Sequence, residues 1–336
     1  MHTSLTVDGI LFAVNPMRVF ARLSSRRPAT AATGTRPRSV AARGGRRRAG
    51  ITASLAATSL MLTGCEFSLD NSLSGITQFF GPEPETALVE LAFSAEDEAA
   101  AFAETNPALS ELRAQQAGVL FDEIARVCGH YPDGTAPETC EVDRTERSGY
   151  DGNHEIADSA EQSLDQLLDS VPQAPEQSRA LLIEQAVMLA LQIPDHEHAI
   201  TAVRDELLAE DSTAPDSWSE MADWEYRLGY GLEAARAFLD GDAAVSTDDA
   251  AANSDARLAT LRELGIDMPQ RALAYHAGEL APDHLEELDD DNAVAFVDNA
   301  LQQTSQQWKH QALDAKDAGW RKLAVLFAAV ANPVVG

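Results

Sequence analysis

Four ionisable side chains of this sequence fall where helical periodicity predicts an apolar, packed face, and they are its candidates for chemistry. They are Glu123, Glu184, Glu225 and His196. A charge that is buried alone is costly, so it normally pairs with an opposite charge, becomes neutral or binds a metal. Inward glutamates together with Glu-x-x-His pairs hold two metal ions in some helical bundles. Two interpretations are therefore open, a set of buried ion pairs or a site for iron or manganese.

The residue pattern favours ion pairs over a metal site. No Glu-x-x-His occurs in the chain, and the nearest pattern, DHEH at 195–198, follows Pro194 in the first turn of a predicted helix. The first and last residues of that pattern point away from the apolar face that contains His196. We therefore expect basic side chains or backbone groups to satisfy the glutamates. The candidate arginines are Arg126, Arg204, Arg227, Arg236 and Arg257.

Helices must position these side chains, and the chain after residue 85 is almost entirely helical in character. Alanine, leucine, glutamate and glutamine are abundant there, and alternating β-branched residues are almost absent. Start signals predict seven or eight helices, with short loops and one longer stretch at 266–291. The predicted starts lie at Asn106 with Pro107, Asn153, Pro175, Pro194, Ser217 with Glu220 as a capping box, Thr247, Asn292 and the region of Lys316. This pattern predicts an all-α protein built as a helical bundle.

The apolar spacing also predicts which face each helix buries. Segment 175–193 is apolar nearly all round, which predicts a central, buried helix that carries Glu184. The stripe of segment 107–128, which includes Glu123, is Leu109, Leu112, Val119, Leu120 and Val127. The stripe after residue 153 is Ile156, Ala160, Leu164, Leu167 and Val171. The stripe of segment 217–240, with Glu225 in its middle, is Trp218, Met221, Leu228, Leu232 and Leu239.

Cys65, the first of three cysteines, ends an apolar run of about 15 residues that follows the arginine-rich stretch GGRRRAG. The run at 49–63 is too short to cross about 30 Å of hydrocarbon as a mature helix. The tetrapeptide LTGC at 62–65 resembles the lipobox of bacterial lipoproteins. The resemblance implies that the sulfur of Cys65 carries a diacylglycerol and that acyl chains hold the protein on the extracytoplasmic face of the cell membrane. The other interpretation is an ordinary cysteine buried at the end of a short helix.

The charge of the chain argues against nucleic acid as a partner. The full sequence has 25 basic and 54 acidic residues and a net charge of −29. Ten arginines and one acidic residue precede Cys65, so the chain from that cysteine onward keeps 15 basic and 53 acidic residues and a net charge of −38. Such a surface repels phosphate backbones.

Cys128 and Cys140 are separated by the turn-rich stretch GHYPDGTAPET. Outside the cytoplasm, a remaining pair of cysteines predicts a disulfide, and a loop of this size gains about 3 kcal/mol from closure. A metal site is the weaker alternative here, because neither a C-x-x-C pattern nor a paired histidine spacing is present. Other reactive signatures are also missing, including G-x-S-x-G, the phosphate-binding Walker loop, the dinucleotide-type glycine pattern and HExxH.

The segment from about residue 216 to 330 resembles an uncharacterised ferritin-like domain of secreted and lipid-anchored proteins from high-GC Gram-positive bacteria. The resemblance rests on the motifs EYRLGYGLEAA with its inward glutamate and Gly-Tyr-Gly bend, NSDARLATLRELGIDMPQRALAY, and the closing pair QQWKHQAL and AGWRKLAVLF. It implies a four-helix, ferritin-type bundle without an established activity, in which Glu225 and Arg257 match the family pattern as a buried polar pair. The chain departs from the pattern at Asn253, where a histidine is expected.

These observations predict four regions and a binding role rather than a reaction. The regions are a leader with signal peptide at 1–64, a lipidated cysteine with tether at 65–85, a helical region with a disulfide loop at 86–212 and the ferritin-like bundle at 213–336. We expect a lipid-anchored, extracytoplasmic binding or envelope-associated module that needs no cofactor, with a membrane as one partner and no nucleic acid. The alternative is a di-metal carboxylate oxidase or metal-handling protein that uses iron or manganese at the four candidate residues.

Overall fold

The described part of the chain contains nine α-helices and one short 3-10 helix, Glu138–Cys140. The computed structural model describes residues 83–131, 134–135, 137–145, 147, 150, 156–275, 280 and 288–332. The α-helices are α1 Thr86–Phe102, α2 Pro107–Cys128, α3 Ala160–Ser170, α4 Glu176–Ala190, α5 His196–Ala209, α6 Trp218–Arg236, α7 Gly241–Glu263, α8 Ala293–Asp314 and α9 Ala318–Ala331. No strand occurs in these ranges, so the predicted all-α class is confirmed. The predicted leader, Cys65 and most of the predicted tether lie outside them.

Helix α9 has the central position in the described fold. Ten of its fourteen residues are buried, because its sequence, AGWRKLAVLFAAVA, is apolar on almost every face. It packs on α8, α5, α4, α3 and α7. The prediction had given the central place to α4, which instead exposes Glu184 and Met188 on one side. No helix in the described ranges has both the length and the hydrophobicity to cross a bilayer.

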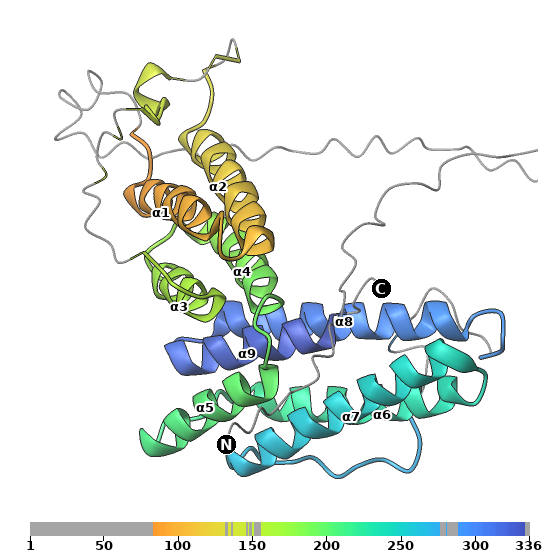
Figure 1. Ribbon diagram of the computed structural model, residues 1–336. Coiled ribbons are helices and arrows are strands. Elements are labelled where there is room, and N and C mark those ends of the chain that lie inside the picture. The colour runs from red at the N-terminus through yellow and green to blue at the C-terminus, as the bar shows by residue number, and fades with distance from the viewer. Residues whose placement is uncertain are drawn as a thin grey trace, which may run out of the picture. The chain divides into compact units, whose positions relative to one another are not determined.

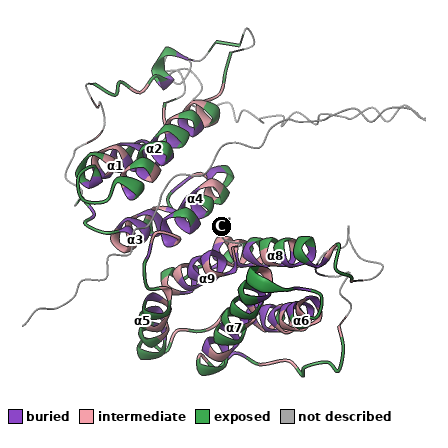
Figure 2. Ribbon diagram, turned by 45° about the vertical axis from the view of Figure 1, so that its right-hand side comes forward, coloured by how far each residue is buried: buried purple, intermediate pink, exposed green. Residues whose placement is uncertain are grey.

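Helices α6 to α9 pack together as a bundle of four. Helix α6 lies beside α7 and α8, and α9 lies beside α8 (Figure 1). All five apolar residues of the predicted α6 stripe are buried, while α7 presents a long exposed face (Figure 2). The ring of Trp218 lies 5.2 Å from that of Trp308 and 4.6 Å from that of Trp320, centre to centre. This aromatic cluster ties α6, α8 and α9 together.

The predicted bend at Gly229–Tyr230–Gly231 is wrong, because α6 runs through these residues without a break. A Cβ atom at Gly231 would lie 2.8 Å from the ring of Phe296. The second glycine therefore allows the close approach of α8 to α6 instead of turning the chain.

Helices α1 and α2 form a hairpin, and α2 also packs on α4. Leu109 and Leu120 of the predicted α2 stripe are buried, but Val119 is exposed and the other two members are half-buried. Arg113 and Gln116 occupy the buried face. The stripe was misplaced because α2 buries polar side chains whose partners come from other helices.

Some predicted helix starts are correct and others are not. Asn106 caps α2, since its side-chain oxygen accepts a hydrogen bond from the amide of Leu109 at 3.2 Å. Helix α8 begins directly after Asn292, as predicted. Helix α3 begins at Ala160, and Ser159 provides its cap. Ile156 precedes the helix and is exposed, whereas the other four residues of the predicted stripe are buried. The predicted cap Asn153 lies outside the described residues.

Of two further predicted starts, Thr247 is wrong, whereas Ser217 is correct, because α6 begins directly after it. Thr247 lies inside α7, where its hydroxyl donates to the carbonyl of Ala243 at 2.8 Å. Ser217 makes no side-chain cap with the first turn of α6. Its hydroxyl donates to the side chain of Gln311 on α8 at 2.6 Å, so the predicted capping box does not form.

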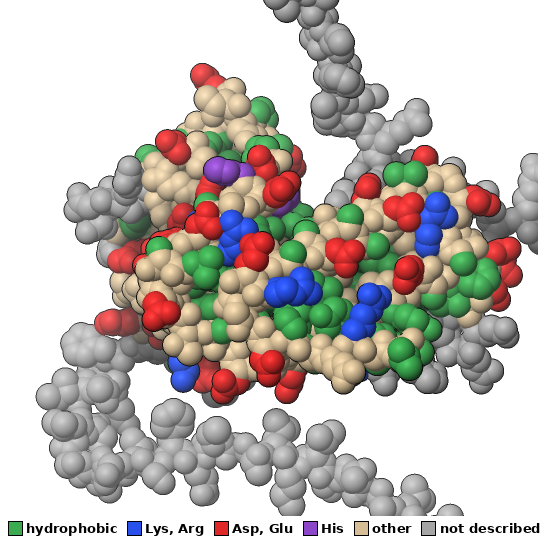
Figure 3. Space-filling model, turned by 90° about the horizontal axis from the view of Figure 1, so that it is seen from below, with side chains coloured by type: hydrophobic (Ala, Val, Ile, Leu, Met, Phe, Trp, Pro, Cys, Tyr) green, Lys and Arg blue, Asp and Glu red, His purple; other side chains and the backbone are tan. Residues whose placement is uncertain are grey.

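The predicted disulfide between Cys128 and Cys140 is present, and it joins the end of α2 to the short 3-10 helix. The Cα atoms of the two cysteines lie 6.0 Å apart, within the range for such bonds. On the face that Figure 3 shows, acidic side chains are spread among hydrophobic ones and basic side chains are fewer.

We predict that Leu323→Ala in α9 lowers the free energy of unfolding by about 2–5 kcal/mol, because it leaves a cavity at the centre of the fold. Leu208→Ala on the exposed face of α5 is the matched control and should cost less than about 0.5 kcal/mol. Urea unfolding followed by circular dichroism measures both values. Equal losses for the two variants would contradict the central position of α9.

Candidate functional site

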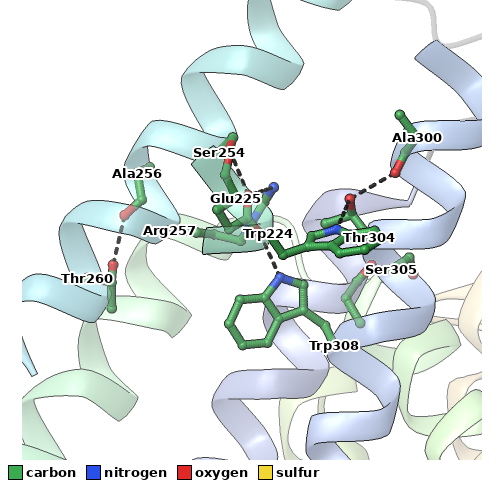
Figure 4. A network of polar contacts seen from close by, with 11 residues as sticks. Trp224, Glu225, Ser254, Ala256, Arg257, Thr260, Ala300, Thr304, Ser305 and Trp308 are labelled. Atoms are coloured by element: carbon green, nitrogen blue, oxygen red, sulfur yellow. Dashed lines mark hydrogen bonds and ion pairs between the residues drawn. The ribbon is translucent and has the colours of Figure 1, made fainter. Parts of the chain in front are cut away.

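Glu225 is fully buried on α6, and four donors from two other helices surround its carboxylate (Figure 4). The guanidinium of Arg257 donates from Nε at 2.7 Å and from Nη2 at 2.9 Å. The Ser254 hydroxyl donates at 2.6 Å, and the Trp308 indole nitrogen donates at 2.7 Å. The predicted buried pair of Glu225 and Arg257 therefore has the fork geometry that gives charge-assisted hydrogen bonds their strength.

Helical spacing explains how the partners of Glu225 come to face it. Ser254 and Arg257 are three residues apart on α7, so both lie on the face that packs against α6. One turn away from Trp308 on α8, Thr304 accepts a hydrogen bond from the indole of Trp224 at 2.9 Å (Figure 4). The network thus joins α6, α7 and α8 at one level of the bundle.

Arg257 also lines a cleft between α5, α7 and α9. The cleft has a volume of about 270 Å³. Its main lining residues are His196, Ile200, Arg204, Asn253, Thr260 and Phe327. Arg257 is only 2% exposed, and its Nη1 atom is a buried donor without a hydrogen-bond partner in the described structure. Two predicted site residues, His196 and Arg257, therefore line the same cleft. The sequence did not predict that they lie together.

His196 is positioned by the backbone rather than by a glutamate. Its ring nitrogen Nε2 lies 3.0 Å from the carbonyl oxygen of Ala190 at the end of α4. Asp195 caps α5 by accepting a hydrogen bond from the amide of His198. The DHEH stretch thus serves to connect α4 to α5 and to border the cleft.

Glu123 is buried on α2 and is satisfied by two partners, as expected. Arg126 donates to its two oxygens at 2.6 Å each, and the hydroxyl of Ser178 on α4 donates at 2.6 Å. The hydrogen bonds from Arg126 lower the pKa of the Glu123 carboxyl, with a smaller contribution from Ser178, and burial acts in the opposite direction.

Glu184 is not buried, and its predicted inward position is wrong. Its side chain is 50% exposed and forms an ion pair with Lys309 on α8. The sequence around Glu184 is apolar, but the helices that pack on α4 cover only its other faces. The face that carries Glu184 therefore reaches solvent.

The four candidate residues do not come together. Glu123 contacts Arg126, Glu184 contacts Lys309, and Glu225 contacts Arg257. Within the described ranges, no group of three or more His, Cys, Asp or Glu side chains has the arrangement to hold a metal ion.

Sequence reasoning missed a second fully buried acid, Glu98 on α1. Arg113 donates from Nε to its carboxylate at 2.8 Å, and the hydroxyl of Ser163 on α3 donates at 2.5 Å. Arg113 also donates to the side chain of Gln116 at 2.6 Å. Burial lowers the pKa of Arg113, and the charge of Glu98 opposes this shift. The sequence does contain a sign that Glu98 is buried, because Glu98 follows the buried residues Leu91 and Ala95 at helical spacing.

The described structure defines an all-α helical bundle with buried ion pairs and a cleft beside one of them. No protein-family model, no curated protein and no solved structure matches the chain. The ferritin-like resemblance and the lipid anchor at Cys65 therefore stay predictions.

We predict that Arg257→Leu lowers the free energy of unfolding by about 3–5 kcal/mol, because the Glu225 carboxylate stays buried without its cation. The double variant Glu225→Leu with Arg257→Leu should recover most of this loss, since no buried charge then remains. Urea unfolding measures each value.

The control for this cycle is Arg236→Leu, which removes an arginine from the surface ion pair with Asp248. Its cost should stay below about 1 kcal/mol. If Arg236→Leu cost as much as Arg257→Leu, burial of the pair would not be the source of the effect.

Glu123 gives a prediction for the dependence of stability on pH. Its folded pKa lies below the ordinary 4.5, so the carboxylate contributes stability above that value and loses it as the pH falls through the folded pKa. The difference in unfolding free energy between the native chain and Glu123→Gln should be constant near pH 7 and shrink below about 4.5. Unfolding at several pH values measures this, with the exposed Glu104→Gln as control. A difference that stays constant in acid would contradict the prediction.

Proposed function

We propose that this chain is a lipid-anchored binding module on the extracytoplasmic face of a membrane, and that the cleft between α5, α7 and α9 takes a small ligand. The observation that carries the binding role is the unpartnered Nη1 of Arg257 beside this cleft. A buried donor without a partner costs about 1–3 kcal/mol, and a ligand oxygen would remove that cost.

The rest of the cleft supports a small, partly apolar ligand. Ile200 and Phe327 supply apolar surface, and Thr260 supplies a polar group. An apolar cleft with a few converging polar groups is typical of small-molecule sites. The rim arginine Arg204 is already held by Asp205 and Glu263. We therefore propose a ligand with an apolar body and a carbonyl or carboxylate oxygen for Arg257.

The anchor in this proposal depends on Cys65. The arginine cluster, the short apolar run and the LTGC tetrapeptide support its acylation. The sequence of residues 66–85 lacks helical periodicity and ends in a proline-rich stretch, which supports a tether. The net charge of −38 after the leader disfavours nucleic acid as a partner.

The alternative, a di-metal carboxylate oxidase or metal-handling protein with iron or manganese, has less support. Such a centre needs several carboxylates around one point. Glu123, Glu184 and Glu225 instead each contact a different basic side chain. We therefore propose that they act as structural ion pairs.

The anchor is tested by expressing the full chain in a bacterium that lipidates its exported proteins, with an alkyne analogue of palmitate in the medium. We expect label on the native chain, its recovery with membranes, and loss of both in Cys65→Ser. The matched control is Cys128→Ser with Cys140→Ser, which removes the other cysteines and should keep the label. Label on the chain that is unaffected by Cys65→Ser would contradict the anchor.

The cleft is tested by ligand-observed NMR with benzamide, benzoate and toluene as probes. We expect the two oxygen-bearing probes to bind better than toluene, because only they can accept from Arg257. Ala259→Trp should abolish this binding by filling the cleft. Ala101→Trp, on the exposed side of α1, is the control and should leave it unchanged. Binding that survives Ala259→Trp would show that the probes use another place.

A further inference from the structure

A second cleft contains three basic side chains that have no acidic partner. It has a volume of about 620 Å³ and lies between the α3–α4 connection, the start of α4, the end of α8 and the start of α9. Its basic residues are Arg179, Lys316 and Arg321. Within the described residues, none of the three lies within ion-pair distance of a carboxylate.

Arg321 is the most deeply placed of the three. It lies in the first turn of α9 and is 5% exposed. Its Nη2 donates to the carbonyl of Ala315 at 2.6 Å, and its Nε is buried without a partner in the described structure. A buried guanidinium usually faces a carboxylate, so this one lacks the group that would normally neutralise it.

Arg179 and Lys316 complete the basic lining. Arg179 is half-buried and donates only to the backbone carbonyls of Ala174 and Pro172, at 3.1 Å each. Lys316 is exposed at the connection between α8 and α9. Burial lowers the pKa of Arg321 most, and the positive charge of Arg179 lowers it further, which indicates that the two guanidinium groups act on one another.

This arrangement is unusual in a chain with so few basic residues. Six other arginines of the described helices each pair with an acid. They are Arg113, Arg126, Arg204, Arg227, Arg236 and Arg257. In a chain with 54 acidic and 25 basic residues, basic groups left without partners at one cleft indicate a place for an external anion.

Acidic groups near the cleft limit the charge that it can accept. Glu176 and Asp314 line it, and the charges of Asp317 and Asp169 raise the pKa of Arg321, Asp317 more strongly than Arg179 lowers it. The start of α4 partly offsets them, since Pro175 gives no side-chain cap and the positive end of the helix dipole lies at this border. Because acidic and basic groups both lie near this cleft, a compact anion bound directly by the guanidinium groups fits it better than a highly charged polymer does.

We infer that this second cleft binds a phosphate group, with Arg321 and Arg179 as its ligands and Lys316 at the mouth. Guanidinium groups match the paired oxygens of phosphate, and the Nε of Arg321 is a buried donor that has no partner in the described structure. The cleft is larger than a phosphate group, and Val171 and Leu313 line it with apolar surface. An organic phosphate fits this description, whether it is a soluble phosphate ester or the head group of a phospholipid.

Calorimetric titration of the full-length Cys65→Ser chain with inorganic phosphate and glycerol 3-phosphate tests the soluble source. Flotation with vesicles of phosphatidylglycerol, against vesicles of phosphatidylcholine, tests the lipid source without the proposed anchor. We expect Arg179→Gln and Lys316→Gln each to weaken binding about tenfold, roughly the effect of one charge-assisted hydrogen bond. These side chains reach solvent, so both variants should fold even if Arg321→Gln does not.

Arg262→Gln is the matched control, because it removes the same charge from an exposed position on α7. Binding of either phosphate or of phosphatidylglycerol vesicles that is weakened by Arg179→Gln and Lys316→Gln but not by Arg262→Gln supports the inference and identifies the source. No binding in any arm, or equal weakening by all three variants, overturns it. Neither result affects the proposed ligand of the first cleft, which the Ala259→Trp experiment tests separately.

Discussion

The enclosure of the Glu225 carboxylate is the constraint on which the bundle depends. A fully buried carboxylate is tolerated only when donors meet it, and here these come from two residues of α7 and one of α8. All three contacts must form at once, so α7 and α8 cannot slide along α6 without leaving the charge unpaired. Apolar packing around Trp218 supplies the hydrophobic stabilisation, whereas the polar network fixes which packing is adopted.

The same rule recurs between the other helices. Glu98 and Arg113 link α1 to α2, with Ser163 of α3 as a third partner, and Glu123 links α2 to α4 through Ser178. Glu98 is neutralised by an arginine of another helix, whereas Glu123 is neutralised by Arg126 of its own helix and receives a further hydrogen bond from α4. The cleft around Arg321 is the reverse case, because within the described residues no carboxylate lies within ion-pair distance of this buried basic group. That contrast is the basis of the proposed phosphate site.

The candidate site could be predicted only in part, and particular residues show why. Periodicity placed Glu225 and Glu123 on buried faces, and both are buried. It also placed Glu184 inside, yet periodicity describes only the helix itself and cannot say that no neighbour covers that side of α4. Thr247 and Ser217 do not act as caps, because the Thr247 hydroxyl donates to the carbonyl one turn earlier in α7 and the Ser217 hydroxyl donates to Gln311 on another helix. Glu98 had the spacing of a buried acid, because it lies on the same helical face as Leu91 and Ala95.

By itself, the sequence determined what local physics controls: the all-α class, the cap at Asn106, the disulfide between Cys128 and Cys140, and the burial of two of the glutamates. Only the tertiary structure decided which helix is central, which further donors meet each buried carboxylate, and which basic groups of the described residues lie beyond ion-pair distance of an acid. Helix formation depends on neighbours within a few residues. The partners of Glu225 come from helices that lie far apart in the chain and meet only when the bundle closes.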